Sequence, residues 1–266
     1  MIIFFIVTRS HAQDSDSKNS LAFNIGPSLI ARQDRIFSPN IHNDFTILNF
    51  GLEYTREARL FQKVRLNYAN YDPMVSGPYD FTEYGEPETA YPHSFNFIDL
   101  DYQIGKKLKE TEKSVLTLGG LFSANVQATS YVYGLFSNLG YYSALGLGAF
   151  ATERFILNEK SHLAATIQLP LMAWVSRSPY LVNDDEFIEN ISSHSGFKSF
   201  TSFVGDGQLV TWDKLQTFDL ELKYTYVLND KWEVGTGYVF EFIHASQPRN
   251  LLSFRNTLNF SANLKF

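Results

Sequence analysis

Apolar and polar residues alternate with a period of two along most of the chain. This pattern is typical of strands that have one apolar and one polar face. A helix would scatter the charges around its circumference. The last segment is the clearest case, because one face is apolar and the opposite face carries only polar and charged side chains. The apolar face holds Leu252, Phe254, Leu258, Phe260, Ala262, Leu264 and Phe266, and the opposite face holds Ser253, Arg255, Thr257, Asn259, Ser261, Asn263 and Lys265.

The alternation predicts ten strands, most of them longer than a tilted strand needs to cross the hydrocarbon layer. We therefore expect an all-β fold, a transmembrane antiparallel up-and-down β-barrel. Twelve strands are the alternative, because 187–213 contains further alternating pieces such as 197–201. The ten predicted strands are 20–32, 44–56, 59–71, 94–108, 114–131, 139–157, 161–176, 215–229, 231–245 and 250–266.

The connections between these strands alternate in length. Outer-membrane barrels have tight periplasmic turns and long outer loops, and this pattern places both chain ends in the periplasm. The connection 246–249 is a brief exception. The expected short connections are 57–58, 110–113, 158–160 and 229–230, and the long ones are 33–43, 72–93, 132–138 and 177–214.

Composition agrees with a membrane barrel. Aromatic residues reach 16%, while charged residues make up 19% of the 266 residues. Mean hydropathy is slightly negative at −0.16. The chain contains no run of eighteen or more apolar residues, so the sequence predicts no membrane-spanning helix. The absence of cysteine excludes disulfides and thiol catalysis. The net charge of −6 argues against nucleic acid as a partner.

The N-terminus is interpreted as an export signal. Residues 2–7 form a short apolar core, and Ser10-His11-Ala12 places small residues at the positions of a cleavage site. We expect a signal peptide at 1–12, truncated at its start, a periplasmic polar tail at 13–19, and a single barrel domain at 20–266. A buried N-terminal strand is the alternative for the first segment.

Charged residues on the polar face predict a register and a luminal charge network. If the hairpins are symmetric, Glu53 faces Lys63, Arg65 faces Asp101, Glu241 lies near Arg255, and Glu233 lies near Lys265. Opposed opposite charges stabilise a strand pair. A ten-stranded barrel is narrow enough for side chains to fill, so we expect a polar plug rather than an open channel. The predicted network is Glu53, Lys63, Arg65, Asp99, Asp101, Glu233, Glu241, Arg255 and Lys265, with Arg32, Asp219, Glu221 and Lys223 also facing inward.

Aromatic residues on the apolar face gather at the ends of strands that meet the short turns. Such rings favour the headgroup level of a membrane. The expected set is Tyr54, Phe155, Tyr226, Trp232 and Phe266. The terminal Phe266, with Phe260 and the apolar residues between them, resembles the sorting signal read by the barrel-assembly machinery of Gram-negative outer membranes. By its composition and the Ala12-Gln13 junction, the chain as a whole resembles the small outer-membrane barrels of Bacteroidota. These resemblances imply a location in the outer membrane, with lipopolysaccharide and other outer-membrane lipids as partners.

The long loops are acidic and aromatic, which leaves two interpretations open. The loop 72–93 carries Asp72, Asp80, Glu83, Glu86 and Glu88 among its tyrosines, and 177–214 carries Asp184, Asp185, Glu186 and Glu189. These loops could bind divalent cations, carbohydrate or peptide, or they could form a solvated acidic surface.

Two enzymatic alternatives are weaker than a non-enzymatic barrel. Asp99 and Asp101 are similar to the paired aspartates of omptin proteases, but those enzymes also need an Asp-x-His pair, which this sequence lacks. Ion pairing with Arg65 is the simpler interpretation of these aspartates. A phospholipase or lipid-A hydrolase needs a base that activates a serine, and the candidates are His194 with its flanking serines and His244.

We therefore expect a barrel acting in envelope structure, surface binding or narrow-solute passage. No catalytic residue, ligand-binding residue, metal ligand or cofactor is assigned. A soluble barrel with its apolar face inward is the third possibility.

Overall fold

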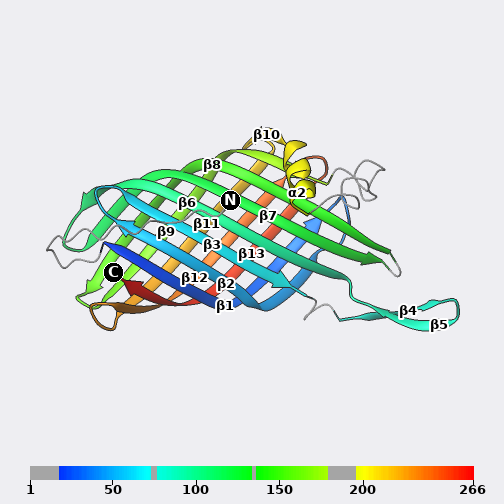
Figure 1. The fold of residues 1–266 in the computed structure, drawn as a ribbon, viewed down its shortest axis with the longest axis horizontal. Helices are drawn as coiled ribbons and strands as arrows, with labels where there is room; N and C mark the ends of the chain where they lie inside the picture. The colour runs from blue at the N-terminus through cyan, green and yellow to red at the C-terminus, as the bar shows by residue number, and fades with distance from the viewer. Residues whose placement is uncertain (1–17, 73–76, 134–135, 179–195) are drawn as a thin grey trace.

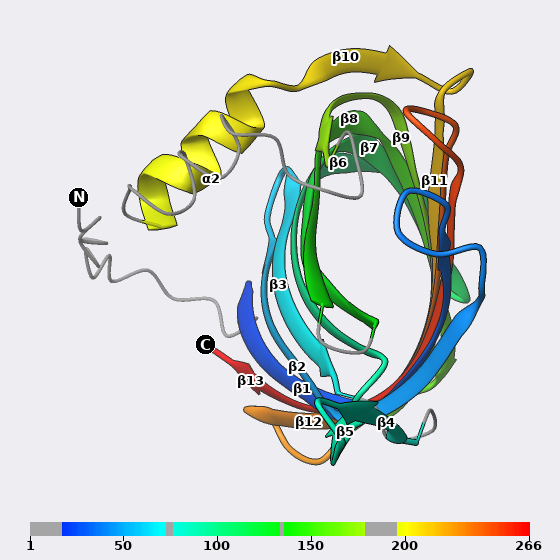
Figure 2. The same cartoon turned by 90° about the vertical axis from the view of Figure 1, so that its right-hand side faces the viewer.

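Ten antiparallel strands close into a tilted barrel in the computed structural model, which describes residues 18–72, 77–133, 136–178 and 196–266 (Figures 1 and 2). The ring order is β9, β11, β12, β13, β1, β2, β3, β6, β7, β8, and β8 pairs with β9 to close it. The predicted ten-stranded barrel is confirmed, and the twelve-stranded alternative is wrong. The barrel strands are β1 (Asn19–Asp34), β2 (His42–Glu57), β3 (Phe61–Tyr71), β6 (His93–Glu110), β7 (Ser114–Tyr133), β8 (Phe136–Asn158), β9 (Ser161–Arg177), β11 (Leu215–Val227), β12 (Trp232–Ala245) and β13 (Leu251–Lys265).

Two long connections contain secondary structure of their own. The connection between β3 and β6 holds a hairpin, β4 (Tyr79–Glu83) and β5 (Glu86–Ala90), which extends away from the barrel (Figure 1). The connection before β11 holds the helix α2 (Gly196–Gly205) and the short strand β10 (Gln208–Thr211), both outside the ring of strands (Figure 2). The alternating segment 197–201 is therefore helical. Five residues are too few for a period of two to be decisive, and apolar residues at 197, 200, 203 and 204 also fit a helix.

The two ends of the barrel differ in the length of their connections. One end, called the short-turn end below, carries the turns after β2, β6, β8 and β11. The start of β1 and the end of β13 lie at the same end. The other, the long-loop end, carries the remaining connections. One of these is shorter than predicted, because β7 runs to Tyr133 and β8 begins at Phe136, so the expected loop 132–138 is wrong. The predicted signal peptide lies outside the described residues, as does the predicted tail up to residue 17.

Apolar side chains point out of the barrel and charged ones point in. Phe260 is 54% exposed, whereas Arg255, on the other face of the same strand, is 6% exposed. Leu220 and Leu222 are also exposed on the outside. The soluble barrel with an inward apolar face is therefore excluded. A closed barrel with this sidedness is a transmembrane barrel of the outer-membrane type. In the described part of the chain, no helix has the length and apolarity needed to cross a membrane.

The predicted register holds in two hairpins and is wrong in one. Arg65 pairs with Asp101, and Glu241 pairs with Arg255, as expected. Glu53 lies opposite Arg65 rather than Lys63. Strand pairing continues to Glu57 opposite Phe61 around a turn of three residues, 58–60, so the partner of Glu53 lies two positions further along than expected.

The hairpin of β12 and β13 also places one expected pair on a diagonal. Glu233 lies opposite Asn263, and Lys265 reaches the Glu233 carboxylate from two residues further along, with Nζ and Oε1 2.9 Å apart. All five aromatic residues predicted for the membrane interface lie near the short-turn end. They are Phe155, Tyr226, Trp232 and Phe266, which are exposed on the outer face, and the partly exposed Tyr54, whose hydroxyl donates to Asn19 Oδ1.

Candidate functional site: a lumen closed at two levels

Arg65 ties opposite walls of the barrel together at mid-height. Its Nη2 lies 2.7 Å from Asp101 Oδ2 on the neighbouring strand β6. Its Nη1 lies 3.4 Å from Glu221 Oε2 on β11, five strands away in the ten-strand ring. The same Glu221 oxygen lies 3.3 Å from Lys63 Nζ. Because β3 and β11 face each other across the barrel, these ion pairs fill the lumen rather than line it.

Two more ion-pair groups cross the lumen at this level. Arg255 on β13 pairs with Glu241 on the adjacent strand and with Asp99 on β6, four strands away. Glu53 on β2 pairs with Lys63, with Nζ and Oε2 2.9 Å apart, and with Lys223 on β11, with Nζ and Oε1 3.0 Å apart. Buried ion pairs of this kind lose much when a single partner is removed, because a charge remains without compensation.

The structure thus brings together the charged residues that the sequence placed on the luminal face, with one change of partner. Asp101 pairs with Arg65, but Asp99 pairs with Arg255. The sequence interpretation had joined both aspartates to Arg65. Asp219 also faces inward, yet among the described residues it has no ion-pair partner.

A second barrier lies at the long-loop end and is organised by Asp34, the last residue of β1. Asp34 Oδ1 lies 2.6 Å from Arg177 Nη2 on β9, and Oδ2 lies 3.3 Å from Arg32 Nη2. Arg32 Nη1 donates to Gln127 Oε1 on β7 at 2.5 Å. Since β1 is four strands from both β7 and β9, these contacts also span the lumen.

The connection between β1 and β2 folds over this mouth and buries its own apolar side chains. Ile36 and Phe37 are buried there. The Phe37 ring stacks on Tyr131, with centroids 4.9 Å apart and planes 8° apart. Both belong to a buried cluster that includes Phe95 and Phe97 of β6. The mouth is therefore capped by aromatic packing above the ion pairs.

Arg177 was not predicted to face the lumen, because the predicted strand ended at residue 176 and because β9 contains a bulge. Below the bulge in β9, even-numbered residues such as Gln168 face inward, whereas above it odd-numbered residues do. The register with β8 shifts between Leu147, which pairs with Met172 of β9, and Gly148, which pairs with Pro170. Arg177 was thus placed in the loop, and a strict period of two carried one residue further would have put it on the outer face. An isolated proline in a predicted strand was the available signal of the bulge.

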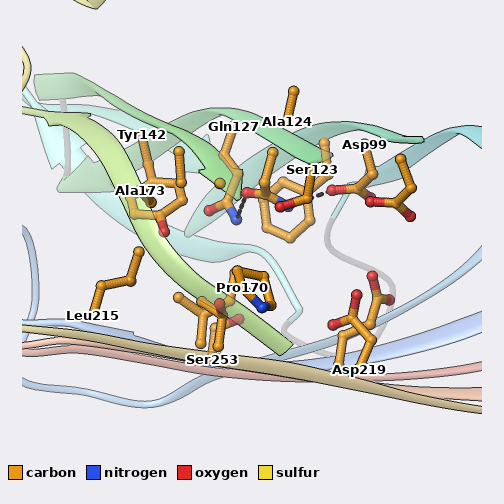
Figure 3. A pocket seen from close by; sticks show the side chains of 18 of the residues that line it. Asp99, Ser123, Ala124, Gln127, Tyr142, Pro170, Ala173, Leu215, Asp219 and Ser253 are labelled. Atoms are coloured by element: carbon orange, nitrogen blue, oxygen red, sulfur yellow. Dashed lines mark hydrogen bonds between the residues drawn. The ribbon is translucent and has the colours of Figure 1, made fainter. Parts of the chain in front are cut away.

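Two cavities of about 60 Å³ or more lie inside the described part of the barrel. A polar vestibule of about 800 Å³ opens at the short-turn end, lined by Lys107, Arg154, His162 and Thr225 among other residues, and its inner end is formed by the Lys63 and Glu221 pair. A cavity of about 60 Å³ lies between the mid-height ion pairs and the mouth (Figure 3). The mid-height ion pairs lie between these two cavities.

The enzymatic alternatives find no assembled site in the described residues. Asp99 and Asp101 are held by arginines, and no histidine lines the cavity that contains them. His244 lies beside Gln216, with Nδ1 and Oε1 3.3 Å apart, and the candidate His194 lies outside the described residues. Within the part of the chain that the structure describes, no three acidic or histidine side chains gather closely enough to hold a metal ion.

One histidine pair at the mouth was not foreseen. His93 Nε2 lies 3.0 Å from Asp44 Oδ2, and His93 Nδ1 lies 3.4 Å from His42 Nδ1. In the described segments, neither imidazole hydrogen-bonds to a serine or threonine hydroxyl that it could activate. The pair is therefore interpreted as a structural contact between β2 and β6. His93 lies 49 positions from Asp44 and 51 positions from His42 in the sequence, so no local motif indicates these contacts.

Comparison with known proteins finds similarity in structure alone. No family model matches the chain, and no curated protein matches it. The match to the outer membrane protease OmpT from Escherichia coli covers 96% of this chain and 99% of the OmpT chain, with 8% identity and a TM-score of 0.47. Neisserial surface protein A covers 94% and 98%, with 9% identity and a TM-score of 0.39. The β domain of the Bordetella autotransporter BrkA covers 93% and 97%, with 11% identity and a TM-score of 0.36. These low values transfer no function to this chain, so its assignment as an outer-membrane barrel rests on its closed ring of strands and its apolar outer face.

Proposed function

We propose that this protein is a non-conducting outer-membrane barrel that anchors a binding surface at its long-loop end, which faces the cell exterior. The observation that carries the proposal is the closure of the lumen at two levels, by Arg65 bridging β6 and β11 and by Asp34 bridging β1 and β9. A barrel closed in this way provides no path for solutes to diffuse through its interior. Its accessible surfaces then carry the function.

The hairpin of β4 and β5 is the best candidate for that surface. It carries four carboxylates and no basic residue between residues 79 and 91. Glu83 and Glu86 lie directly opposite each other at its end, a pairing of like charges that destabilises an isolated hairpin. Tyr84 at the tip is 99% exposed. This combination favours a partner with a basic surface, because a basic partner neutralises the opposed carboxylates while Tyr84 supplies apolar contact area.

Planar-bilayer recording tests the closed lumen. We expect wild-type protein to show no ion conductance, and liposomes containing it to resist swelling in small sugars. Steady single-channel conductance from the wild-type protein would contradict the proposal.

Replacement of residues 79–90 by a short Gly-Ser linker tests the binding surface. The barrel should fold as before, and binding of a basic peptide such as oligolysine to proteoliposomes should fall. The matched control is Glu112→Gln with Glu159→Gln, which removes two exposed carboxylates from turns at the opposite end. Equal loss of binding in the control would refute a role for the hairpin.

A further inference from the structure

The wall of the barrel is interrupted between β9 and β11. Eight consecutive residue pairs join these strands from Tyr226 opposite Ser161 up to Asp219 opposite Gln168. Above that point β9 pairs instead with β10, from Thr211 opposite Met172 to Gln208 opposite Val175. The upper residues of β11, 215–218, are paired with β12 alone. Residues 169–171 of β9 and 212–218 of the following segment therefore face each other without a backbone ladder.

Pro170 explains the interruption locally. Proline has no N–H to donate to a neighbouring strand. The register of β9 also shifts at this point, so the extra residue Leu171 bends the strand. The Pro170 carbonyl accepts a hydrogen bond from the indole Nε1 of Trp212 at 2.6 Å. A side chain thus replaces the missing strand-to-strand bond, and Trp212 closes the seam.

The 60 Å³ cavity lies directly behind this seam (Figure 3). On the seam side, Pro170 and Ala173 of β9 and Leu215 of β11 give it an apolar part, and Thr217 and Asp219 of β11 continue the same wall. The far wall is polar and includes Asp99 and Arg255. The cavity is therefore amphiphilic, with its apolar part next to the gap in the barrel.

Two buried polar atoms on the cavity wall have no hydrogen-bond partner in the described part of the chain. The Tyr142 hydroxyl is one, on a side chain only 1% exposed. Arg255 Nη1 is the other, and the half-buried Asp219, which also lines the cavity, has no ion pair among the described residues. Buried polar atoms are normally paired with protein or water. Their convergence on one small cavity indicates that it receives a hydrogen-bonding group.

The outer surface at the seam is suited to lipid. Leu171, Met172 and Leu209 are exposed there. Trp174 and Trp212 are both partly exposed, as expected for rings at the headgroup level. Next to them, α2 packs on the outside of β8 and β9, where Phe203 stacks on Tyr141 with ring centroids 4.1 Å apart. The seam therefore opens toward the membrane rather than toward water.

From these observations we infer that the β9–β11 seam is a lateral port for a single-chain neutral amphiphile from the membrane, with Trp212 as its hydrogen-bonded closure. The chain of the ligand stays in the bilayer, and its hydroxyl head group occupies the cavity. A hydroxyl can accept from Arg255 Nη1 and donate to Asp219 at once. A carboxylate or phosphate head is repelled, because four carboxylates (Asp99, Asp101, Asp219 and Glu241) and one guanidinium line the cavity.

Access requires the seam to widen. The cavity as it stands has room for about two waters at the volume of liquid water. No backbone ladder joins β9 to β11 at residues 169–171, so the hydrogen bond between Trp212 and Pro170 is the bond that must break there. The same interruption that weakens the wall thus makes this seam the place where opening disturbs the fewest bonds. The proposal does not depend on the hairpin or on the closed lumen.

Thiol labelling tests the port, because the chain contains no cysteine. Thr217→Cys places a thiol on the cavity wall, and Thr225→Cys places one on the same strand but in the vestibule. In proteoliposomes, we expect a maleimide with a long alkyl chain to label Thr217→Cys faster than a sulfonated maleimide does. The order should reverse for Thr225→Cys. Faster labelling of Thr217→Cys by the sulfonated reagent would overturn the port.

A matched pair of variants then tests the closure. Trp212→Phe removes the indole bond to Pro170, whereas Trp174→Phe removes an equivalent bond of 2.7 Å to the Val204 carbonyl, which does not cross the seam. Loss of one hydrogen bond corresponds to about a tenfold rise in alkyl-maleimide labelling of Thr217→Cys. We expect this rise for Trp212→Phe and not for Trp174→Phe. Equal rates in the two variants would refute the role of Trp212.

Competition identifies the ligand class. Oleyl alcohol should slow alkyl-maleimide labelling of Thr217→Cys, and oleate should slow it less. The carboxylate of oleate is repelled by the carboxylates of the cavity wall. Protection by oleate equal to that by oleyl alcohol would overturn the assignment of a neutral head group. Folding of every variant is checked by the shift in gel migration on heating.

Discussion

Arg177 and Asp34 form the ion pair that holds the mouth of the barrel, with Nη2 and Oδ1 2.6 Å apart. Arg177 Nη1 also donates to the carbonyls of Gln247, at 3.0 Å, and Arg249, at 2.5 Å, in the connection between β12 and β13. One guanidinium therefore joins β9, β1 and a loop that are far apart in the sequence. Its planar fork of donors suits this role, which lysine could not fill.

Arg177→Ala should destabilise the barrel by about 3 kcal/mol, the lower end of the range for breaking a buried ion pair, because Arg32 still faces Asp34. Urea unfolding from lipid vesicles, followed by tryptophan fluorescence, measures the change. The control is Arg35→Ala on the exposed neighbouring residue, which should shift stability by less than about 0.5 kcal/mol. Similar effects of the two substitutions would show that the mouth contacts contribute little.

Gly119→Ala should destabilise the barrel, while Gly120→Ala should not. Gly119 faces Gly105 across β6 and β7, and a Cβ at Gly119 would lie 2.0 Å from the Ile104 carbonyl oxygen. The backbones must then separate, at a cost of about 1–3 kcal/mol. A Cβ at Gly120 meets nothing within 4 Å. The urea midpoints of the two variants give the comparison, and a loss at Gly120 as large as that at Gly119 would contradict close packing of these strands.

A charge exchange tests the pair Glu241 and Arg255. Arg255→Glu alone places a third carboxylate beside Asp99 and Glu241, so we expect it to fail to fold. Adding Glu241→Arg restores one pair but leaves Asp99 facing a carboxylate. The double variant should therefore fold, with stability below wild type and with a coupling of about 0.5–3 kcal/mol. Gel migration before and after heating reports folding, and a double variant no better than Arg255→Glu would argue against direct coupling.

The sequence predicted the barrel because the period of two is imposed by the membrane and the lumen on every strand. Charged residues such as Arg65 and Asp101 could be paired in advance because they sit in a regular hairpin. The contacts across the lumen could not. Arg255 reaches Asp99 over four strands, and this depends on the tilt and closure of the ring rather than on local pattern. Arg177 was hidden for a local reason, because the predicted strand ended at residue 176 and the bulge at Pro170 reverses the faces of β9 above it.

The two barriers act in series, so opening one should leave the lumen closed. We expect no conductance from Arg177→Ala alone, or from Arg65→Gln with Arg255→Gln alone, because in each case the other barrier remains. The triple variant should conduct in planar bilayers, because loss of Arg177 also releases Asp34 and with it the connection that carries the Phe37 cap. It should prefer cations, since Asp99, Asp101 and Glu221 lose the arginines that neutralise them.

Lys265→Gln is the control for this series, because Lys265 lies in the open vestibule outside both barriers. It should leave the wild-type and triple-variant conductances unchanged. Conductance from Arg65→Gln with Arg255→Gln while Arg177 is intact would show that the mouth is already open. In that case the aromatic cap over Tyr131 would not be a barrier, and the lumen would be gated by the mid-height ion pairs alone.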